Sequence, residues 1–456
     1  MAIPENGNGT SLDLQVAEKA YGRGDYQLSG HTVMQLLARN PYDIEALLLM
    51  SKILIDTEKS PLALAVAEKL TALAPDDWRC WLVRGTCEAS LIDKAPVDSM
   101  LRAEELAPDN PSVLRSIAFA HAVNYRFKEA EEYARKAIPL EEHPQGHVAL
   151  GFACLHTQRY GEGWDAYARG MGHQAFREKQ NYGLPDWEGQ KGRLLVYAEQ
   201  GLGDQIAFCT TLKNANVKQL VCHPKLESVF KAAFPRIEVY GGQFQKEIEW
   251  KVEADYQCSM SELQRFYRRS VKDFPGTPYL VPHPAKRFQW AALLRSLGKR
   301  PKVGIAWTGG TPGAHGWFSR NVQLEDWKPI FESVDADFIS LEYKERDTEG
   351  FPIHDFPWGT QTDNYEDTIA LIDCLDAVVC VPTTAYHAAG ALGAPAIVAV
   401  HSTPHWHEQT PWYKSVQFLN RHDNYINDII ERLRKCVSSS ESIRALRSPT
   451  TSSSGR

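Results

Sequence analysis

The sequence predicts a helical repeat solenoid followed by two α/β lobes, and three observations support this fold class. Apolar helical segments recur over residues 1–170, separated by Asn40-Pro41, Ala74-Pro75 and Ala107-Pro108 at intervals of 34 and 33 residues (41 to 75, and 75 to 108). A segment rich in glycine and proline follows. From residue 192, short apolar runs that favour strands alternate with helical stretches, which is typical of parallel sheets.

Composition limits the class of protein. The chain has 456 residues, which is more than one ordinary hydrophobic core requires. A formal net charge of -7 argues against a general nucleic-acid-binding protein, whose contact surface would be basic. The nine cysteines include no Cys-x-x-Cys pair, so we expect buried free thiols rather than a zinc or redox site. No apolar run approaches the length of a membrane span, and we expect a cytoplasmic protein.

Residues 1–170 resemble tetratricopeptide repeats, in which about 34 residues form each helical pair. Ser60-Pro61 and Asn110-Pro111 place a capping side chain before a proline at the first helical position. Small residues recur where helices pack closely, among them Ala63, Ala67, Ala130 and Ala134. We count four to five units, the first and last atypical. Such a solenoid binds a peptide or protein on its concave face, or only packs against its neighbouring domain.

The remaining chain divides into five segments. Residues 171–191 form a connector, and residues 192–283 form a first lobe with strands expected at 193–198, 218–223 and 236–240. An inter-lobe helix is expected within residues 284–299. Residues 300–437 form a second lobe, with strands expected at 302–307, 336–341, 377–381 and 396–400 and a final helix over 421–437. Residues 438–456 are rich in Ser, Thr and Arg and are expected to be a disordered tail.

The first candidate site follows the first predicted strand. Gly201-Leu202-Gly203-Asp204 forms a turn at the start of a helix, where backbone amides favour a phosphate or an anionic intermediate. The turn is not a dinucleotide fingerprint, because Ile206 occupies the third glycine position and no ribose-binding acid follows the second strand. Asp204 is therefore either a helix cap or, if it faces the cleft between the lobes, a general base.

Two strand ends of the second lobe carry further candidates. Thr308, Gly309 and Gly310 follow one strand, and Arg320 comes shortly after them, a combination that suits a diphosphate, although a lone arginine is commonly a surface ion pair. Thr383 and Thr384 follow another strand and can cap a helix or donate to phosphate. The next candidate, His387, is either a packed core residue or a catalytic one.

Three histidines, His401, His405 and His407, lie close together in the sequence. Imidazoles bind transition metals, but only Glu408 among nearby carboxylates could complete a ligand set. We therefore expect a structural loop here and no metal ion.

Taken in chain order, these segments resemble glycosyltransferase family 9, the heptosyltransferase-like enzymes, and in particular the group that carries N-terminal tetratricopeptide repeats. The matching segments span about residues 190 to 420. They are Ala198–Asp204, Val303–Gly309, Arg320 with Leu324-Glu325, Ser340-Leu341-Glu342, Leu375-Asp376 through His387 to Pro395, and Pro411-Trp412-Tyr413.

The resemblance implies a glycosyltransferase B-type fold of two Rossmann-like lobes, with the acceptor mainly on the first lobe and a nucleotide sugar on the second. It makes Asp204 the base and assigns diphosphate contacts to Arg320. By the same resemblance, Glu342 lies near the nucleoside. The remaining donor or phosphate contacts fall to Gly203, Thr308, Gly309, Gly310, Thr383 and Thr384, with His387 beside them as a second catalytic candidate.

One position departs from the family pattern. Pro382 stands where the family usually has an aspartate, and proline lacks both the carboxylate and the backbone N–H. We expect an inverting, metal-independent hexosyl- or heptosyltransferase that needs no cofactor besides its nucleotide-sugar co-substrate. Its acceptor would be a protein or peptide at the surface of the repeats and the first lobe. The alternatives are a non-catalytic scaffold with a degenerate transferase domain, and a sugar-nucleotide epimerase or hydrolase. The oligomeric state does not follow from the sequence.

Overall fold

The computed structural model describes residues 12–57, 59–91, 98–171, 179–243, 249–310, 320–401 and 404–447. These residues divide into two compact units, of which the first ends at Ala153 and the second begins at Cys154. This division lies before the predicted end of the repeats at residue 170. The last helix of the repeat region therefore belongs to the second unit.

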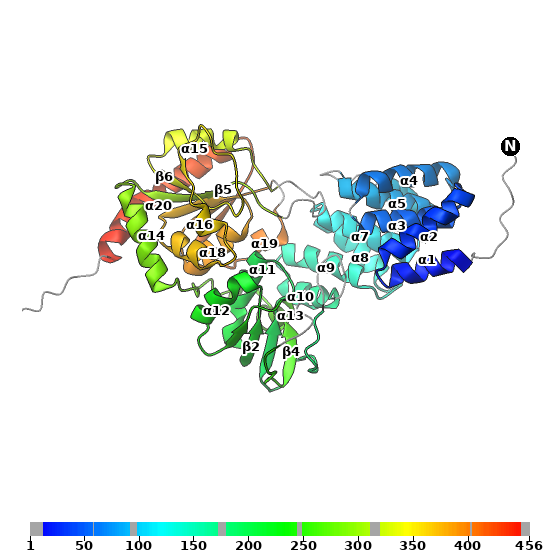
Figure 1. The fold of residues 1–456 in the computed structure, drawn as a ribbon, viewed down its shortest axis with the longest axis horizontal. Helices are drawn as coiled ribbons and strands as arrows, with labels where there is room; N and C mark the ends of the chain where they lie inside the picture. The colour runs from blue at the N-terminus through cyan, green and yellow to red at the C-terminus, as the bar shows by residue number, and fades with distance from the viewer. Residues whose placement is uncertain are drawn as a thin grey trace, which may run out of the picture. The chain divides into compact units, whose positions relative to one another are not determined.

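The first unit is built from helical pairs that follow one another along the chain (Figure 1). The pairs are α1 (Leu12–Gly22) with α2 (Tyr26–Arg39), α3 (Ile44–Asp56) with α4 (Ser60–Leu73), α5 (Trp78–Leu91) with α6 (Asp98–Leu106), and α7 (Pro111–Val123) with α8 (Phe127–Ala137), after which α9 (Pro144–His156) begins. Each pair also packs against the next, α2 against α3, α4 against α5 and α6 against α7. This arrangement confirms the predicted helical repeat solenoid.

Local sequence accounts for these helices. Ala63 and Ala67 of α4 are fully buried, as close packing between helices requires. Asn110 caps α7 by accepting hydrogen bonds from backbone N–H groups of its first turn. The predicted cap at Ser60 is wrong, because α4 begins one residue earlier than expected. Ser60 is its first helical residue, and Lys59 before it makes no side-chain cap.

The second unit contains a first lobe with a parallel four-stranded sheet. Its strands are β1 (Leu194–Tyr197), β2 (Val217–Val221), β3 (Glu238–Tyr240) and β4 (Tyr256–Ser259), in the order β3-β2-β1-β4. The helices of this part of the chain are α10 (Tyr160–Arg169), α11 (Leu202–Phe208), α12 (Glu227–Ala233) and α13 (Met260–Tyr267). The three predicted strands are confirmed, and β4 adds an edge strand.

The second lobe contains a parallel six-stranded sheet in the order β10-β9-β8-β5-β6-β7. The strands are β5 (Lys302–Ala306), β6 (Asp337–Ser340), β7 (Ile353–His354), β8 (Ala377–Cys380), β9 (Ala396–Val400) and β10 (Val416–Asn420). The helices are α14 (Pro284–Ser296), α15 (Lys328–Ser333), α16 (Pro357–Thr360), α17 (Glu366–Asp373), α18 (Thr384–Leu392), α19 (Trp406–Gln409) and α20 (Tyr425–Arg447). The four predicted strands are present, and the whole region is the parallel α/β architecture that the sequence predicts.

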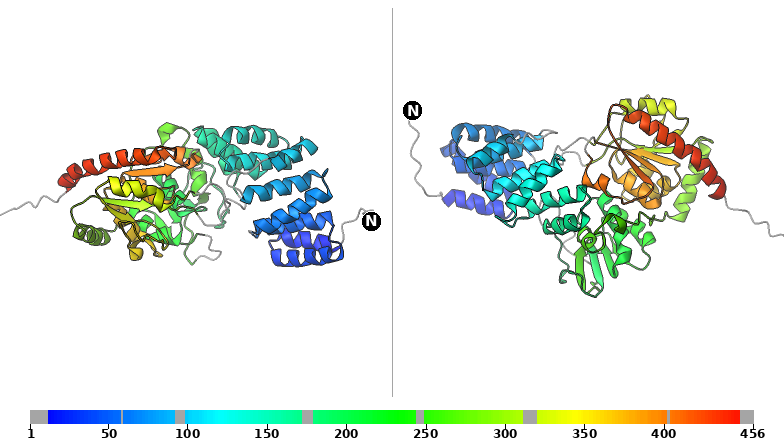
Figure 2. Two further views of the ribbon diagram at one scale, coloured as in Figure 1. Left: turned by 90° about the horizontal axis from the view of Figure 1, so that it is seen from above. Right: turned by 180° about the vertical axis from the view of Figure 1, so that it is seen from behind.

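Helices cover both faces of this second sheet, and α20 runs along one of them (Figure 2). Val303 and Ile305 of β5 share a core with Ile429 and Leu433 of α20. On the other face, α18 packs against β8 and β9. All residues of β5, β8 and β9 are buried, which explains why β8 and β9, and β5 after Lys302, are continuous apolar runs.

Three sequence expectations concern the chain as a whole. Helix α20 extends to Arg447 and so occupies the first part of the segment 438–456 that the sequence predicts as a disordered tail. The rest of that segment lies outside the described residues. The nine cysteines are free thiols, all buried except Cys374 and Cys436, which are partly exposed. Among the described residues, no helix is long and apolar enough to cross a membrane.

Candidate functional site

Asp204 lies in the first turn of α11, and four residues (198–201) separate this helix from the end of β1. Gly201, with extended backbone, is the N-cap of this helix, so the helix-cap role considered for Asp204 in the sequence analysis is excluded. A carboxylate in a first helical turn is stabilised as an anion by the helix dipole. The side chain of Asp204 is 31% exposed and points toward the second lobe, where it meets His407.

The contact between Asp204 and His407 joins the two lobes. The Nε2 atom of His407, in α19, lies 3.0 Å from Oδ1 of Asp204. Burial opposes ionisation of Asp204, but the contact with His407 and the nearby charge of Arg320 outweigh it, and the pKa of Asp204 lies below its ordinary value. Both ring nitrogens of His407 are buried and make no hydrogen bond among the described residues, so Nε2 lies at ion-pair distance from Oδ1 of Asp204 without hydrogen-bond geometry. Asp204 is thus held as a carboxylate beside an imidazole.

His387 lies next to this pair, in the first turn of α18. Its ring packs against the backbone of Gly203, where a Cβ atom would lie 2.8 Å from Cδ2 of the imidazole. Its Nδ1 atom is 3.2 Å from the hydroxyl oxygen of Tyr413. Burial, together with the charge of His407, lowers the pKa of His387 well below its ordinary value. His387 is therefore a neutral side chain at physiological pH, in contact with Gly203 and close to Asp204.

His405 and Glu408 shape the start of α19. His405 is its N-cap, and Glu408 closes a capping box by accepting from the backbone N–H of His405. Burial raises the pKa of Glu408 above its ordinary value. Within the part of the chain that the structure describes, no group of three or more His, Cys, Asp and Glu side chains could hold a metal ion.

A cluster of aromatic rings packs against His407. Trp164 of α10 packs edge-on against Phe208 of α11 at 6.0 Å between ring centroids and against Trp406 at 5.5 Å, and it lies 6.3 Å from Trp412. The ring of Trp406 in turn lies 3.8 Å from that of His407. Trp164 is 1% exposed. The last helix of the repeat region therefore forms part of the wall that positions His407.

The glycine loop after β5 is fixed by Glu342, which follows β6. The carboxylate of Glu342 accepts hydrogen bonds from the backbone N–H groups of Trp307 and Thr308, each at 2.8 Å, and from the hydroxyl of Thr308. Arg346 donates to both Glu342 and Thr308. Glu342 is 1% exposed, and its carboxylate oxygens accept hydrogen bonds from the loop and from Arg346. It therefore fixes the orientation of the loop.

The same loop contacts the turn that precedes α18. A side chain at Gly309 would collide with the carbonyl oxygen of Pro382, so glycine is needed for this close approach. Gly310 has a positive φ of 82°, which also favours glycine. Thr383 is the N-cap of α18 but makes no side-chain cap, and Thr384 begins the helix. The hydroxyl of Thr383 is therefore not engaged in capping.

Two groups of predicted residues are brought together. One contains Gly203, Asp204 and His387, and the charge of Arg320 also influences Asp204 and His387. The other contains Thr308, Gly309, Glu342 and the turn at Thr383. Sequence reasoning gave His407 only a structural role and did not select Trp164 or Tyr413. Trp412 and Tyr413 were noted only within a matching segment, and no signal in the sequence links α10 to this site.

The chain is similar in sequence to a known bacterial protein. No protein-family profile matches the chain. It is 27% identical over 428 residues to Protein FlbA of Caulobacter vibrioides, a match that covers 84% of this chain and 70% of that protein.

The chain is also similar to solved tetratricopeptide-repeat structures over about a third of its length. TTC0263 of Thermus thermophilus, described as a thermophilic TPR protein, has 21% identity and a TM-score of 0.33, and the match covers 35% of this chain and 88% of that one. The MamA structure has 17% identity and a TM-score of 0.29, and the match covers 34% of this chain and 92% of that one.

Proposed function

We propose that the protein is an inverting, metal-independent glycosyltransferase with a two-lobed B-type fold. The observation that carries the proposal is the Asp204–His407 contact. It places an ionised carboxylate where the two parallel-sheet lobes meet, just beyond the carboxyl end of β1. Ligands of parallel α/β sheets bind beyond the carboxyl ends of the strands. The resemblance to heptosyltransferase-like enzymes supplies the reaction class.

In the proposed reaction, Asp204 accepts the proton of an acceptor hydroxyl. The hydroxyl oxygen forms a bond to the anomeric carbon while the bond from that carbon to the diphosphate breaks, so the configuration inverts. The nucleoside diphosphate leaves with the electron pair. Arg320 and the backbone N–H groups at the start of α18 would stabilise the charge that develops on it. His387 would donate or accept a hydrogen bond as a neutral imidazole.

The nucleotide sugar would lie on the second lobe, against the glycine loop held by Glu342 and the turn at Thr383 and Thr384. The acceptor would be a protein or peptide bound by the helical repeats, because concave solenoid surfaces serve such partners. Neither the sugar nor the nucleotide is specified by these residues, since phosphate is common to all such donors.

The first test is a thermal-shift and ligand-observed NMR screen with ADP-, UDP-, GDP-, CMP- and dTDP-sugars. We expect one nucleotide class to bind. The radiolabelled donor of that class is then incubated with the wild-type protein and a cell extract. The Asp204→Asn variant should bind the donor with near wild-type affinity and transfer no label. An Asp363→Asn variant, altered at an exposed carboxylate, should retain transfer. Full turnover by Asp204→Asn would refute the role of Asp204.

A second candidate function is a non-catalytic scaffold, and Pro382 favours it. The family aspartate is missing at this position, and the Pro382 carbonyl packs against Gly309 where a donor phosphate would have to approach. This hypothesis predicts that none of the five donor classes binds to a well-folded sample.

A further inference from the structure

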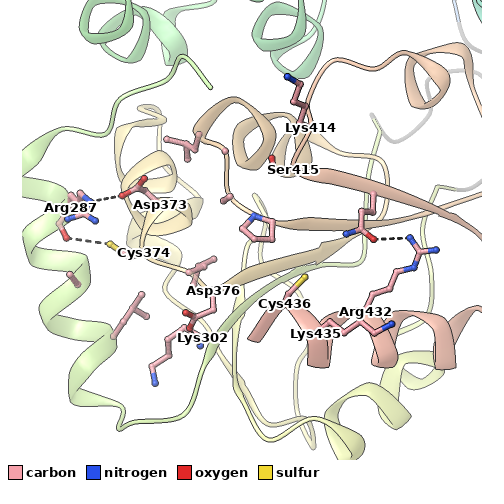
Figure 3. Close-up of a pocket in the computed structure, with 18 of the residues that line it drawn as sticks. Arg287, Lys302, Asp373, Cys374, Asp376, Lys414, Ser415, Arg432, Lys435 and Cys436 are labelled. Carbon is pink, nitrogen blue, oxygen red and sulfur yellow. Dashed lines mark hydrogen bonds and ion pairs between the residues drawn. The ribbon is translucent and has the colours of Figure 1, made fainter. Parts of the chain in front are cut away.

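A separate cavity of about 1230 Å³ opens at the amino-terminal ends of the strands of the six-stranded sheet, on the side away from the candidate site (Figure 3). It is lined where strands begin, by Lys302 of β5, Asp376 just before β8, Pro395 just before β9 and Ser415 just before β10. Helices α14 and α20 contribute its other walls. Because the strands are parallel, this end of the sheet is remote from the strand ends that carry His387 and Glu342.

The cavity combines an apolar floor with paired carboxylates. Its apolar lining comes from Ala291, Leu294, Leu375, Leu392, Ala394 and Pro395. The carboxylates are all engaged: Asp373 pairs with Arg287, Asp376 accepts from the backbone N–H of Lys302, Asp428 pairs with His422, and Glu431 pairs with Lys435. No carboxylate is therefore left to bind a cationic ligand.

Three cations in the lining lack a carboxylate partner among the described residues. Arg295 donates to a backbone carbonyl in the last turn of α14, where the helix dipole favours a cation. That explanation does not extend to Arg432, which lies in the middle of α20 and donates only to the amide oxygen of Gln417, at 2.8 Å. Nor does it extend to Lys414, which lies in the loop before β10. The lining thus has an excess of basic side chains, six Lys and Arg residues against four carboxylates.

Ser415, which directly follows Lys414 in the chain, carries a buried hydroxyl. The Oγ atom of Ser415 is buried and makes no hydrogen bond within the described part of the chain. Figure 3 shows Ser415 next to Lys414, with Arg432 facing the same cavity from α20. Buried hydroxyls normally have a partner, and this oxygen has no exposed surface in the structure, so the Ser415 side chain must rotate to present its hydroxyl to the cavity.

We propose that this cavity binds an organic anion with an apolar body, in which a carboxylate is joined to a hydrocarbon chain. The anionic group would accept hydrogen bonds from Arg432, and from Ser415 once its side chain rotates toward the cavity, with Lys414 adding charge at the rim. The hydrocarbon would cover the floor at Leu294, Leu392 and Pro395. This site is independent of the proposed sugar transfer.

Isothermal titration calorimetry with octanoate on the full-length protein tests the proposal. Acetate, which carries only the charge, and octanol, which carries only the hydrocarbon, are the comparison probes. We expect octanoate to bind at least about tenfold more tightly than either, since charge and burial both contribute. Equal affinities for octanoate and octanol, or no octanoate binding, would overturn it.

Two pairs of variants locate the binding. Ala291→Glu places a carboxylate on the floor and should abolish octanoate binding, whereas Ala292→Glu, on the exposed side of the same helix, should not. Arg432→Gln should weaken octanoate about tenfold, and Arg434→Gln, on α20 but outside the cavity, should leave it unchanged. Circular dichroism confirms that each variant is folded. Octanoate affinity that is the same in both members of a pair would contradict the site.

Discussion

The Oδ1 atom of Asp204 lies 3.0 Å from Nε2 of His407, so a carboxylate of the first lobe and an imidazole of the second form one contact. The two residues are separated by most of the α/β region in sequence. Neither has the environment it would have in its own lobe alone. The pair therefore depends on the packing of the lobes, and the pKa of Asp204 reports on that packing.

Replacing His407 should raise the pKa of Asp204. The variant His407→Phe keeps an aromatic ring in the cluster but removes the favourable contact that opposes burial. We expect the pKa of Asp204 to rise, because burial is then opposed by one interaction fewer. A ¹³C NMR titration of the aspartate carboxyl carbons measures it. His422→Phe, altered at an exposed histidine, is the control, and an unchanged Asp204 in His407→Phe would refute the coupling.

Acid should destabilise the second unit because His387 is buried as a neutral ring. Its pKa in the folded state is lowered, so below an unfolded-state pKa of 6.5 the unfolded chain binds the proton more readily and stability falls as pH falls. His387 should contribute a slope of about 1.4 kcal/mol per pH unit below that value. Urea unfolding between pH 7 and 5 measures this slope, and His387→Gln should reduce it. A slope that the substitution leaves intact would assign the effect elsewhere.

Trp164→Ala should destabilise the α/β unit although the residue lies in the last helix of the repeat region. The substitution removes a fully buried indole that contacts residues of both lobes, and we expect a loss of about 3–5 kcal/mol in the free energy of unfolding. Trp358→Ala, which removes an indole that is 58% exposed, should cost about 1 kcal/mol. Denaturant unfolding followed by near-ultraviolet circular dichroism compares them, and similar losses would be inconsistent with the packing described.

The buried ion pair at the start of β5 should be far more sensitive than a surface pair. Asp337 and Lys302 are 2.6 Å apart, and both are almost fully buried. Asp337→Asn leaves the ammonium of Lys302 without its counter-charge and should cost about 3–5 kcal/mol. Asp165→Asn, which disrupts a half-exposed pair with Arg269, should cost about 1 kcal/mol or less. Equilibrium unfolding measures both variants, and equal losses in the free energy of unfolding for Asp337→Asn and Asp165→Asn would contradict this prediction.

The network between Glu342 and Thr308 should behave as one unit. Glu342→Gln and Thr308→Val each disrupt the hydrogen bonds that fix the loop after β5. We expect each to cost about 1–3 kcal/mol, and the double variant to cost less than the sum. Thermal unfolding of the four proteins completes the cycle. Strict additivity would show that the two groups act independently.

The buried strands were predictable, and of the four edge strands only β3 was predicted. β8 and β9, and β5 after Lys302, are apolar runs because helices cover both faces of the sheet around them. The missed strands β4, β7 and β10 all lie at sheet edges. β4 contains Gln257 and β10 contains Gln417, while β7 has two residues, so none of them forms a continuous apolar run.

The candidate site was predictable only where its residues follow strand ends. Asp204, Thr383 and Glu342 do so, and topology brings such positions to one edge of a sheet. His407 follows β9 at a distance, and its approach to Asp204 depends on how the lobes pack, which no local pattern encodes. Trp164 was missed because it fits the repeat pattern, and nothing in that pattern distinguishes a tryptophan that faces another domain.

The place of α10 limits how this chain can be recombined. A fragment that starts at residue 171 would lack Trp164, and the rings of Phe208 and Trp406 would be exposed to water. Such a fragment should self-associate when expressed. The helical repeats cannot be exchanged as a complete unit ending at α10. The boundary between the two compact units, each with its own hydrophobic core, lies inside α9. In a lineage with this architecture, the last helix of the repeat array should therefore be inherited together with the α/β unit, while the number of repeats before it is free to change.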